Sequence, residues 1–228
     1  MSILSGDQDA AVALLIAMLP RSQTLNVLDP VYNTWTTQFD RILQSTTVAS
    51  FTRSTPLHSF SRLAELNMQG DGNDSYPSSG ILAKSMLIPS MRRLKVSYIE
   101  GQDEPWPHEN GSSEVIEIDL DNCAIDSNSL SACLRGVRSL QSFKFTFNSC
   151  VPHTPSCLEP RGTLAALTKY CSKTLVYLVL NMERPEKYEN FEDGEPFLDS
   201  LRSFEVLETI RLDSAMLFQK VEESTTSI

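Results

Sequence analysis

The chain has 228 residues, of which 41% are hydrophobic and 21% are charged, and its formal net charge at pH 7 is −10. This length and composition suit one domain with a substantial core, so we take residues 1–228 as a single domain. The acidic balance, without any run of Lys or Arg, argues against nucleic acid and against an anionic membrane surface as partners.

The cysteines and the N-terminal segment indicate where the protein resides. The five cysteines are odd in number and include no C-x-x-C pair, which is typical of a protein that stays reduced. The apolar segment Asp9–Leu19 has no basic residue before it and no small-residue cleavage site after it, so it does not resemble a secretory signal. It is also too short to span a bilayer. We expect an intracellular protein, cytoplasmic or nuclear.

The first half of the chain alternates predicted helices with short strand-like phrases. Asp9–Leu19 is predicted to be a helix that ends at Pro20, and a weak strand-like phrase follows at Leu25 and Val27. Further helices are predicted over residues 38–48 and 79–87, and clearer strand-like phrases lie at residues 63–68 and 91–99.

The clearest phrase is Val115–Ile125, which reads V-I-E-I-D-L-D-N-C-A-I. It is apolar at places 1, 4, 6 and 11, and Cys123 stands at place 9, where it can hydrogen-bond the backbone of a bend. A predicted helix over residues 127–137 follows, with Ser127 or Ser129 as its expected N-cap. Similar phrases begin at residues 140, 175 and 207, with predicted helices over 163–171 and 196–204 between them.

Val115–Ile125 fits the leucine-rich-repeat template L-x-x-L-x-L-x-x-[N/C]-x-L at every fixed position, and the other six phrases fit part of it, the weak first one only at Leu25 and Val27. Any one of them would equally fit an ordinary half-buried strand. Their place-4 residues are Leu25, Leu66, Leu94, Ile118, Phe143, Leu178 and Ile210. Successive members are 41, 28, 24, 25, 35 and 32 positions apart, so the outer repeats carry insertions. We therefore predict an α/β fold, a leucine-rich-repeat solenoid of about seven irregular repeats, with a curved parallel sheet on the concave side and helices on the convex side.

No motif for catalysis, cofactor binding or metal binding stands out. Asp119 and Asp121 form a D-x-D pair, yet they alternate with Ile118 and Leu120 and fit the solvated face of a strand. Residues 71–74 lack the spacing of a calcium loop, and the three histidines are scattered along the chain. We therefore expect a non-enzymatic protein without a cofactor or a metal.

The residues that the template leaves free form the first candidate binding surface. Places 3, 5 and 7 of each repeat point to the side of the sheet opposite the core. The candidate protein-binding residues among them are Arg93, Lys95, Glu117, Asp119, Asp121, Lys144 and Tyr177. The place-5 row reads Asn67, Lys95, Asp119, Lys144, Val179 and Arg211. Its alternating charges fit either a polar strip that binds a protein or cross-strand charge pairs that need no ligand.

Polar insertions at residues 69–80, 101–113 and 183–196 form the second candidate surface. Trp106 lies between Pro105 and Pro107 in an acidic stretch, where an aromatic anchor could dock a basic partner. Solvated loops without a partner are the alternative. Residues 218–228 are expected to form a disordered tail.

Three segments between residues 79 and 217 resemble fungal F-box-type leucine-rich-repeat proteins: S-M-L-I-P-S-M-R-R-L-K-V, V-I-E-I-D-L-D-N-C-A-I and K-T-L-V-Y-L-V-L. The resemblance implies repeats that hold a protein, in members that recruit a cullin-type ubiquitin ligase through a Skp-type adaptor bound by the F-box. The chain shows no F-box-like L-P-x-E segment, because Leu19 and Pro20 are followed by Arg21 and Ser22. We therefore predict a non-enzymatic protein-binding module, with the substrate-binding part of a ubiquitin-ligase adaptor as the alternative.

Overall fold

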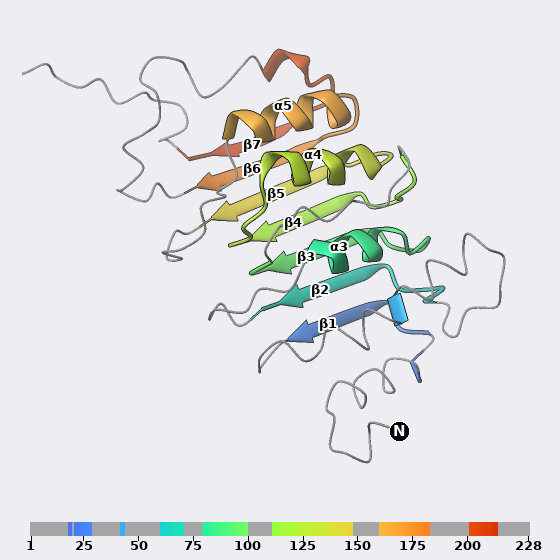
Figure 1. Cartoon of the computed structure of the whole chain (residues 1–228). Coiled ribbons are helices and arrows are strands. Elements are labelled where there is room, and N and C mark those ends of the chain that lie inside the picture. Colours follow the sequence, from blue (N-terminus) through green and yellow to red (C-terminus); the bar gives the residue numbers. More distant parts are fainter. Residues whose placement is uncertain are drawn as a thin grey trace, which may run out of the picture.

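Seven strands form one all-parallel sheet in the computed structural model, which describes residues 18–19, 21–28, 42–43, 60–70, 79–99, 111–147, 160–182 and 201–213. The order of the strands across the sheet is their order along the chain (Figure 1). The predicted α/β class and the parallel sheet are thereby confirmed. The strands are β1 (Thr24–Leu28), β2 (Glu65–Gln69), β3 (Arg93–Ser97), β4 (Glu117–Asp121), β5 (Ser142–Phe147), β6 (Tyr177–Met182) and β7 (Thr209–Leu212).

Helices lie along one side of this sheet (Figure 1). They are α3 (Ser79–Met86), α4 (Ser127–Gly136), α5 (Pro160–Cys171) and the short 3-10 helix η2 (Leu201–Ser203). The first two match the predicted helices closely, and residues 42 and 43 are helical, as the prediction over 38–48 requires. Of the predicted helix over residues 9–19, only residues 18 and 19 are described, and neither is helical.

The helix starts correct two expectations from the sequence. The N-cap of α4 is Asp126, whose side chain accepts hydrogen bonds from Asn128 N and Ser129 N at 2.8 Å each, so neither predicted serine is the cap. A carboxylate at this position also favours the positive end of the helix dipole. The helix predicted from residue 163 begins instead at Pro160, a residue suited to the first helical position because it has no N–H to leave unpaired.

The strand register places equivalent template positions side by side. Ile118 pairs with Leu94 on one neighbour and with Phe143 on the other, so all three place-4 residues share one row. Burial alternates along the strands, and in β4 the residues at places 4 and 6 are buried while those at places 3, 5 and 7 are half-buried. The predicted division into inward and outward residues is confirmed for β2, β3 and β4.

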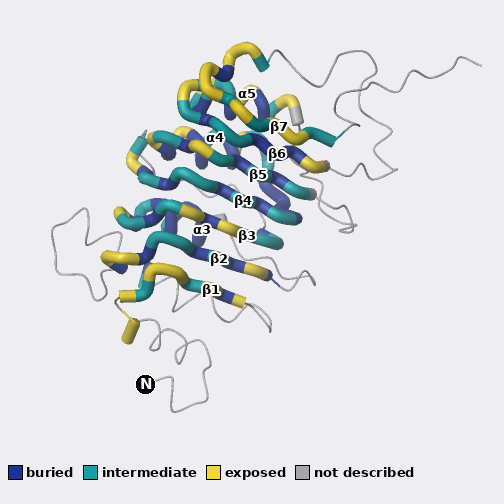
Figure 2. Tube along the Cα trace, turned by 180° about the vertical axis from the view of Figure 1, so that it is seen from behind, coloured by how far each residue is buried: buried dark blue, intermediate teal, exposed yellow. Residues whose placement is uncertain are grey.

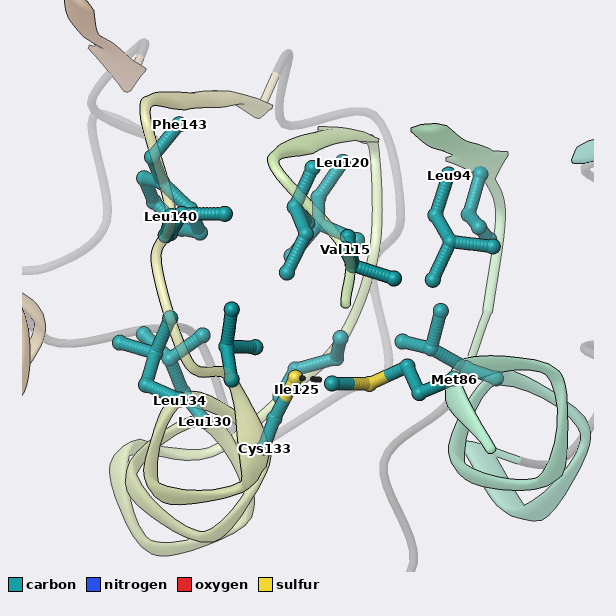
Figure 3. Packing of buried hydrophobic residues seen from close by; sticks show 14 of the residues in the cluster. Met86, Leu94, Val115, Leu120, Ile125, Leu130, Cys133, Leu134, Leu140 and Phe143 are labelled. Carbon is teal, nitrogen blue, oxygen red and sulfur yellow. Dashed lines mark hydrogen bonds between the residues drawn. The ribbon is translucent and has the colours of Figure 1, made fainter. Parts of the chain in front are cut away.

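The core fills the space between the sheet and the helices (Figure 3). Places 1, 4 and 6 supply its sheet side, where Phe143 and Phe145 are completely buried. The buried face of α4 supplies Leu130, Cys133 and Leu134. The thiol of Cys133 reaches the neighbouring repeat, where its Sγ lies 3.5 Å from Met86 Sδ. Successive repeats are therefore joined by side-chain packing as well as by the sheet.

One backbone hydrogen-bond pattern recurs at each step from one strand to the next. The carbonyl oxygen at place 2 of a repeat accepts hydrogen bonds from the N–H groups at places 2 and 3 of the following repeat. Ile116 O, for example, accepts from Gln141 N at 2.9 Å and from Ser142 N at 3.0 Å. The other acceptors at place 2 are Gln23, Ala64, Arg92, Gln141 and Val176. The repeats thus share one backbone arrangement before each strand, even where their side chains differ.

A second shared feature lies at place 8, directly after the strand. The N–H groups of Gly70, Tyr98 and Asn122 each donate to the place-7 carbonyl oxygen of the next strand, at 3.0, 3.0 and 2.7 Å. Tyr98 and Asn122 both adopt left-handed backbone angles there, with φ of 59° and 50°. Two neighbouring repeats therefore make the same bend out of the sheet, and asparagine tolerates this conformation better than most residues.

The strands at the ends of the sheet are less buried than those in the middle (Figure 2). Ile210 of β7 is 39% exposed and Leu28 of β1 is 65% exposed. The sequence prediction that Ile210 lies inside is therefore wrong, because β7 pairs with only one strand in the described part of the chain. Leu212 is partly buried and packs against the core, in better agreement with the prediction.

The structure also bears on membrane insertion. Among the described residues, no helix combines the length and the apolar character that crossing a bilayer requires.

Candidate binding face

The side of the sheet opposite the helices is the candidate binding face, which we call the open face. It consists of the side chains at places 3, 5 and 7 of the strands, and none of the described helices lies on it (Figure 1). The register aligns the place-5 residues in one row: Asn26, Asn67, Lys95, Asp119, Lys144, Val179 and Arg211. The row inferred from the sequence is thus confirmed as a physical row across the sheet.

Two groups of ion pairs divide the charges of the open face. Glu65 of β2 attracts both cations of β3, with Arg93 Nε 3.2 Å from Oε2 and Lys95 Nζ 3.8 Å from Oε1. Lys144 of β5 forms an ion pair with Asp119 of the adjacent strand β4. Its Nζ lies 3.2 Å from each carboxylate oxygen of Asp119. Cross-strand pairing therefore occurs between β2 and β3 and between β4 and β5.

No ion pair joins β3 to β4 among the described residues, although the register places Lys95 beside Asp119 and Arg93 beside Glu117. The long basic side chains of β3 lean to Glu65 instead. The carboxylate of Glu117 has no hydrogen-bond or ion-pair partner in the described part of the chain. The β4 strand therefore presents more negative charge to the open face than its neighbours neutralise.

The pKa of the Asp121 side chain reflects its surroundings at the end of β4. Its pKa is raised, chiefly because burial desolvates the carboxylate and also because Asp119 carries the same charge, while Lys144 acts in the opposite direction. The only hydrogen bond to its side chain among the described residues comes from Asn122 Nδ2 at 3.4 Å. A cation brought to this end of β4 would therefore relieve an unfavourable charge.

Two buried oxygen atoms on the open face accept no hydrogen bond from a described residue. Asn67 Oδ1 is one of them, although the amide nitrogen of the same residue donates to Asn26 Oδ1 at 2.6 Å and to Glu65 Oε1 at 3.2 Å. Asp119 Oδ1 is the other, although the Lys144 ammonium lies at ion-pair distance. Because both oxygens are shielded from water, they carry a desolvation cost within the fold.

The structure gathers seven of the eight predicted binding residues on one face: Arg93, Lys95, Glu117, Asp119, Asp121, Lys144 and Tyr177. The eighth, Trp106, lies outside the described residues, as do most of the three polar insertions and the 218–228 segment. Val179 departs from expectation, since it occupies the outward row but is only 8% exposed. In the strand register it lies between Lys144 and Arg211.

Sequence reasoning missed the part played by Glu65. The repeat template placed Glu65 at place 3 of β2. It did not indicate that Glu65 would form ion pairs with both basic side chains of β3, which leaves the carboxylates of β4 without them. The side chain of Glu65 is only 17% exposed, whereas those of Arg93 and Lys95 are 48% and 46% exposed. The Asp119 carboxylate beside Lys95 is nearly as buried, at 22% exposure, but already lies 3.2 Å from Lys144 Nζ.

Neither a metal site nor an activated thiol is found among the described residues. No group of three or more His, Cys, Asp or Glu side chains among them could hold a metal ion. Burial raises the pKa of Cys123 and of Cys171 to about 12 each, so both thiols stay protonated at neutral pH and are poor nucleophiles. The Cys123 thiol has a structural contact instead, with Sγ 3.3 Å from Val96 O of the preceding strand.

The arrangement of the open face can recognise a charged or polar surface, since it combines exposed cations with an excess of carboxylates on β4. Comparisons with known proteins add no identification. The chain matches no family model, no curated protein and no solved structure.

Proposed function

We propose that this chain is a solenoid of the leucine-rich-repeat type, with a concave sheet face, that binds another protein and catalyses no reaction. The open face is the proposed contact surface, with Arg93, Lys95, Glu117, Asp119 and Lys144 at its centre. The partner is an intracellular protein with charged groups that complement this mixed surface.

The observation that carries this proposal is the unequal neutralisation of charge between β3 and β4. Exposed cross-strand ion pairs contribute only about 0–1 kcal/mol each, so stability alone does not require a charged row in the middle of the sheet. A row that served stability would also pair the cations of β3 with the carboxylates of β4 beside them. Instead, Glu117 has no cation among the described residues. Charges left unmatched within a fold are available to a partner.

The repeat assignment draws support from the backbone. The hydrogen-bond pattern at place 2 recurs at all six steps between the seven strands. The positions that the template reserves for apolar residues are buried in the central strands. An array whose units contact mainly their neighbours exposes one continuous sheet face, which suits the binding of extended partners.

A charge-swap variant tests the open face with little risk to the fold. Asp119→Lys combined with Lys144→Glu keeps an opposite-charge pair at the site of the 3.2 Å contact but inverts the charges that a partner meets. We expect a partner isolated with the wild-type chain from native extract to bind the variant at least about tenfold more weakly in a titration with purified components, as for charged interface contacts worth about 2 kcal/mol.

A second swap provides the matched control. Glu114→Arg combined with Arg138→Glu exchanges the partners of an ion pair that lies before β4 and after α4, away from the open face. We expect this variant to bind the same partner as the wild-type chain does. Equal binding by all three proteins would reject the open face as the contact surface, and equal weakening by both swaps would indicate a non-specific charge effect.

A further inference from the structure

Basic residues form a row at the C-terminal ends of the helices. The strands are parallel, so each connecting helix runs back and ends at the edge of the molecule where the next strand begins (Figure 1). Lys84, Arg135 and Lys169 lie in the last turns of α3, α4 and α5, and Arg202 lies in η2. None of these helices contains an Asp or a Glu. Cations here stabilise the helix dipoles, but they also concentrate positive charge along one edge.

The charge of the described fold is opposite to that of the chain. The described residues include 14 Lys and Arg against 9 Asp and Glu, a formal charge of +5, whereas the whole chain has a formal charge of −10. The open face is nearly balanced, because its cations and carboxylates occur in similar numbers. The positive excess therefore arises largely at the edge where the helices end, and the overall acidity of the sequence conceals it.

The row is best defined between α4 and α5, at a site that we call the basic corner: Arg135, Lys169 and Lys173, with Ser131 and Tyr170. The three basic side chains are exposed. Lys169 Nζ lies 5.0 Å from the centre of the Tyr170 ring. Hydrogen bonds from Lys169 and Ser131, with the nearby charge of Arg135, lower the pKa of the Tyr170 hydroxyl. The two helices thus bring their cations to one phenol group.

No carboxylate among the described residues forms an ion pair with the cations of the basic corner. Glu114 is engaged by Arg138, and Asp126 caps the opposite end of α4. Glu205 comes close along the backbone, where its N–H donates to Ser172 O at 2.9 Å, but its carboxylate forms no ion pair with a described residue. The corner is therefore a concentration of positive charge with two hydroxyl groups beside it.

We propose that the basic corner binds an acidic polypeptide segment of a partner, at a site separate from the open face. Carboxylates suit this set of groups, since a guanidinium holds a carboxylate through two parallel hydrogen bonds while ammonium and hydroxyl groups supply further donors. A short acidic segment fits better than a long polyanion such as nucleic acid. The basic corner supplies three exposed cations, fewer than the extended cluster of Lys and Arg that binding a nucleic-acid backbone requires.

The test uses the full chain and a fluorescein-labelled peptide of four Glu-Ser units, followed by fluorescence anisotropy. We expect binding at low ionic strength that weakens as salt is added, because the charges involved are exposed. Replacing Arg135, Lys169 and Lys173 together by Gln removes the positive charge without reversing it, and we expect at least a tenfold loss of affinity. The matched variant Lys95→Gln/Lys144→Gln removes two cations from the open face and is expected to bind the peptide as the wild-type chain does.

Two further probes separate the alternatives, and circular dichroism melting checks that both variants fold. A Gln-Ser peptide of the same length is expected not to bind, and a twelve-residue single-stranded oligothymidylate is expected to bind more weakly than the acidic peptide. Tighter binding of the oligonucleotide, no binding of the acidic peptide, or equal losses in the two variants would each overturn the proposal. Failure of the open-face experiment would leave this result unaffected, because the two surfaces share no residue.

Discussion

Cys123 and Asp126 hold the bend that leads from β4 into α4. The thiol lies 3.3 Å from Val96 O, and the carboxylate accepts hydrogen bonds from two backbone N–H groups at the start of the helix. The sequence predicted the first role only in part: it expected the thiol to hydrogen-bond the backbone of the bend that follows, whereas the acceptor Val96 O lies in the preceding strand β3. It did not predict the second, because serine, threonine and aspartate all suit an N-cap and three such residues stand close together.

Removal of the Asp126 cap tests this assignment. Asp126→Ala leaves the N–H groups of Asn128 and Ser129 without their acceptor and is expected to lower the free energy of unfolding by about 1 kcal/mol, within a range of about 0.5–2 kcal/mol. Urea unfolding followed by circular dichroism measures it. Ser127→Ala is the control and is expected to cost less. A larger loss of unfolding free energy for Ser127→Ala would indicate that Ser127, one of the two serines predicted from the sequence, is the N-cap.

Which side chains face outward could be predicted, but not which of them pair. The period of two along a strand determines the face, so places 3, 5 and 7 of β2, β3 and β4 were assigned correctly. Partner choice depends on how far Arg and Lys side chains bend and on which carboxylates are already paired, as Glu65 and Asp119 show. Neither property can be read from a repeat template, and for that reason the charge gap between β3 and β4 became visible only in three dimensions.

At the scale of elements, the same template position has different consequences in the middle and at the end of the sheet. Ile118 and Ile210 both occupy place 4, yet Ile118 is completely buried while Ile210 is 39% exposed. Ile118 has a strand on each side, whereas β7 has one neighbour among the described strands. A sequence pattern assigns one role to both residues because it contains no information about neighbours across the sheet.

This difference predicts unequal costs for the same substitution. Ile118→Ala removes buried methyl and methylene groups and leaves a cavity, so we expect a loss of about 2–5 kcal/mol in the free energy of unfolding. Ile210→Ala is expected to cost about 1 kcal/mol or less, because much of the side chain already contacts water. Urea unfolding of the two variants under one set of conditions compares them directly. Equal losses would show that β7 is packed as tightly as β4.

At the scale of the whole molecule, charge is distributed unevenly over the fold. The open face mixes both signs, the edge at the helix ends is basic, and the net acidity of the chain lies elsewhere in the sequence. Composition alone argued against nucleic acid and against an anionic membrane surface as partners. That reasoning averages over the chain, whereas binding depends on the local charge, and so the basic corner could not be found from net charge.

Stability should also vary along the array. Each repeat contacts mainly its neighbours, so opening is expected to begin at the ends and to reach the centre last. Hydrogen exchange followed by mass spectrometry should therefore show faster exchange at the N–H groups of Glu208 and Thr209 than at those of Gln141 and Ser142, although all four donate to place-2 carbonyl oxygens. Uniform protection across the sheet would indicate that the seven strands open as one cooperative unit.

The shared acceptor at place 2 has a consequence for how such a chain can change in length. Arg92 O faces two N–H groups of the next repeat, and Ile116 O faces the equivalent two groups of the repeat after it. Excising the residues from Ile116 to Leu140 would bring Gln141 and Ser142 to the place that Ile116 and Glu117 now occupy. Arg92 O would then accept the same pair of backbone hydrogen bonds, now from Gln141 N and Ser142 N. Such a chain can lose or duplicate whole repeats without a new kind of junction. Insertions of other lengths must form loops that connect the strands.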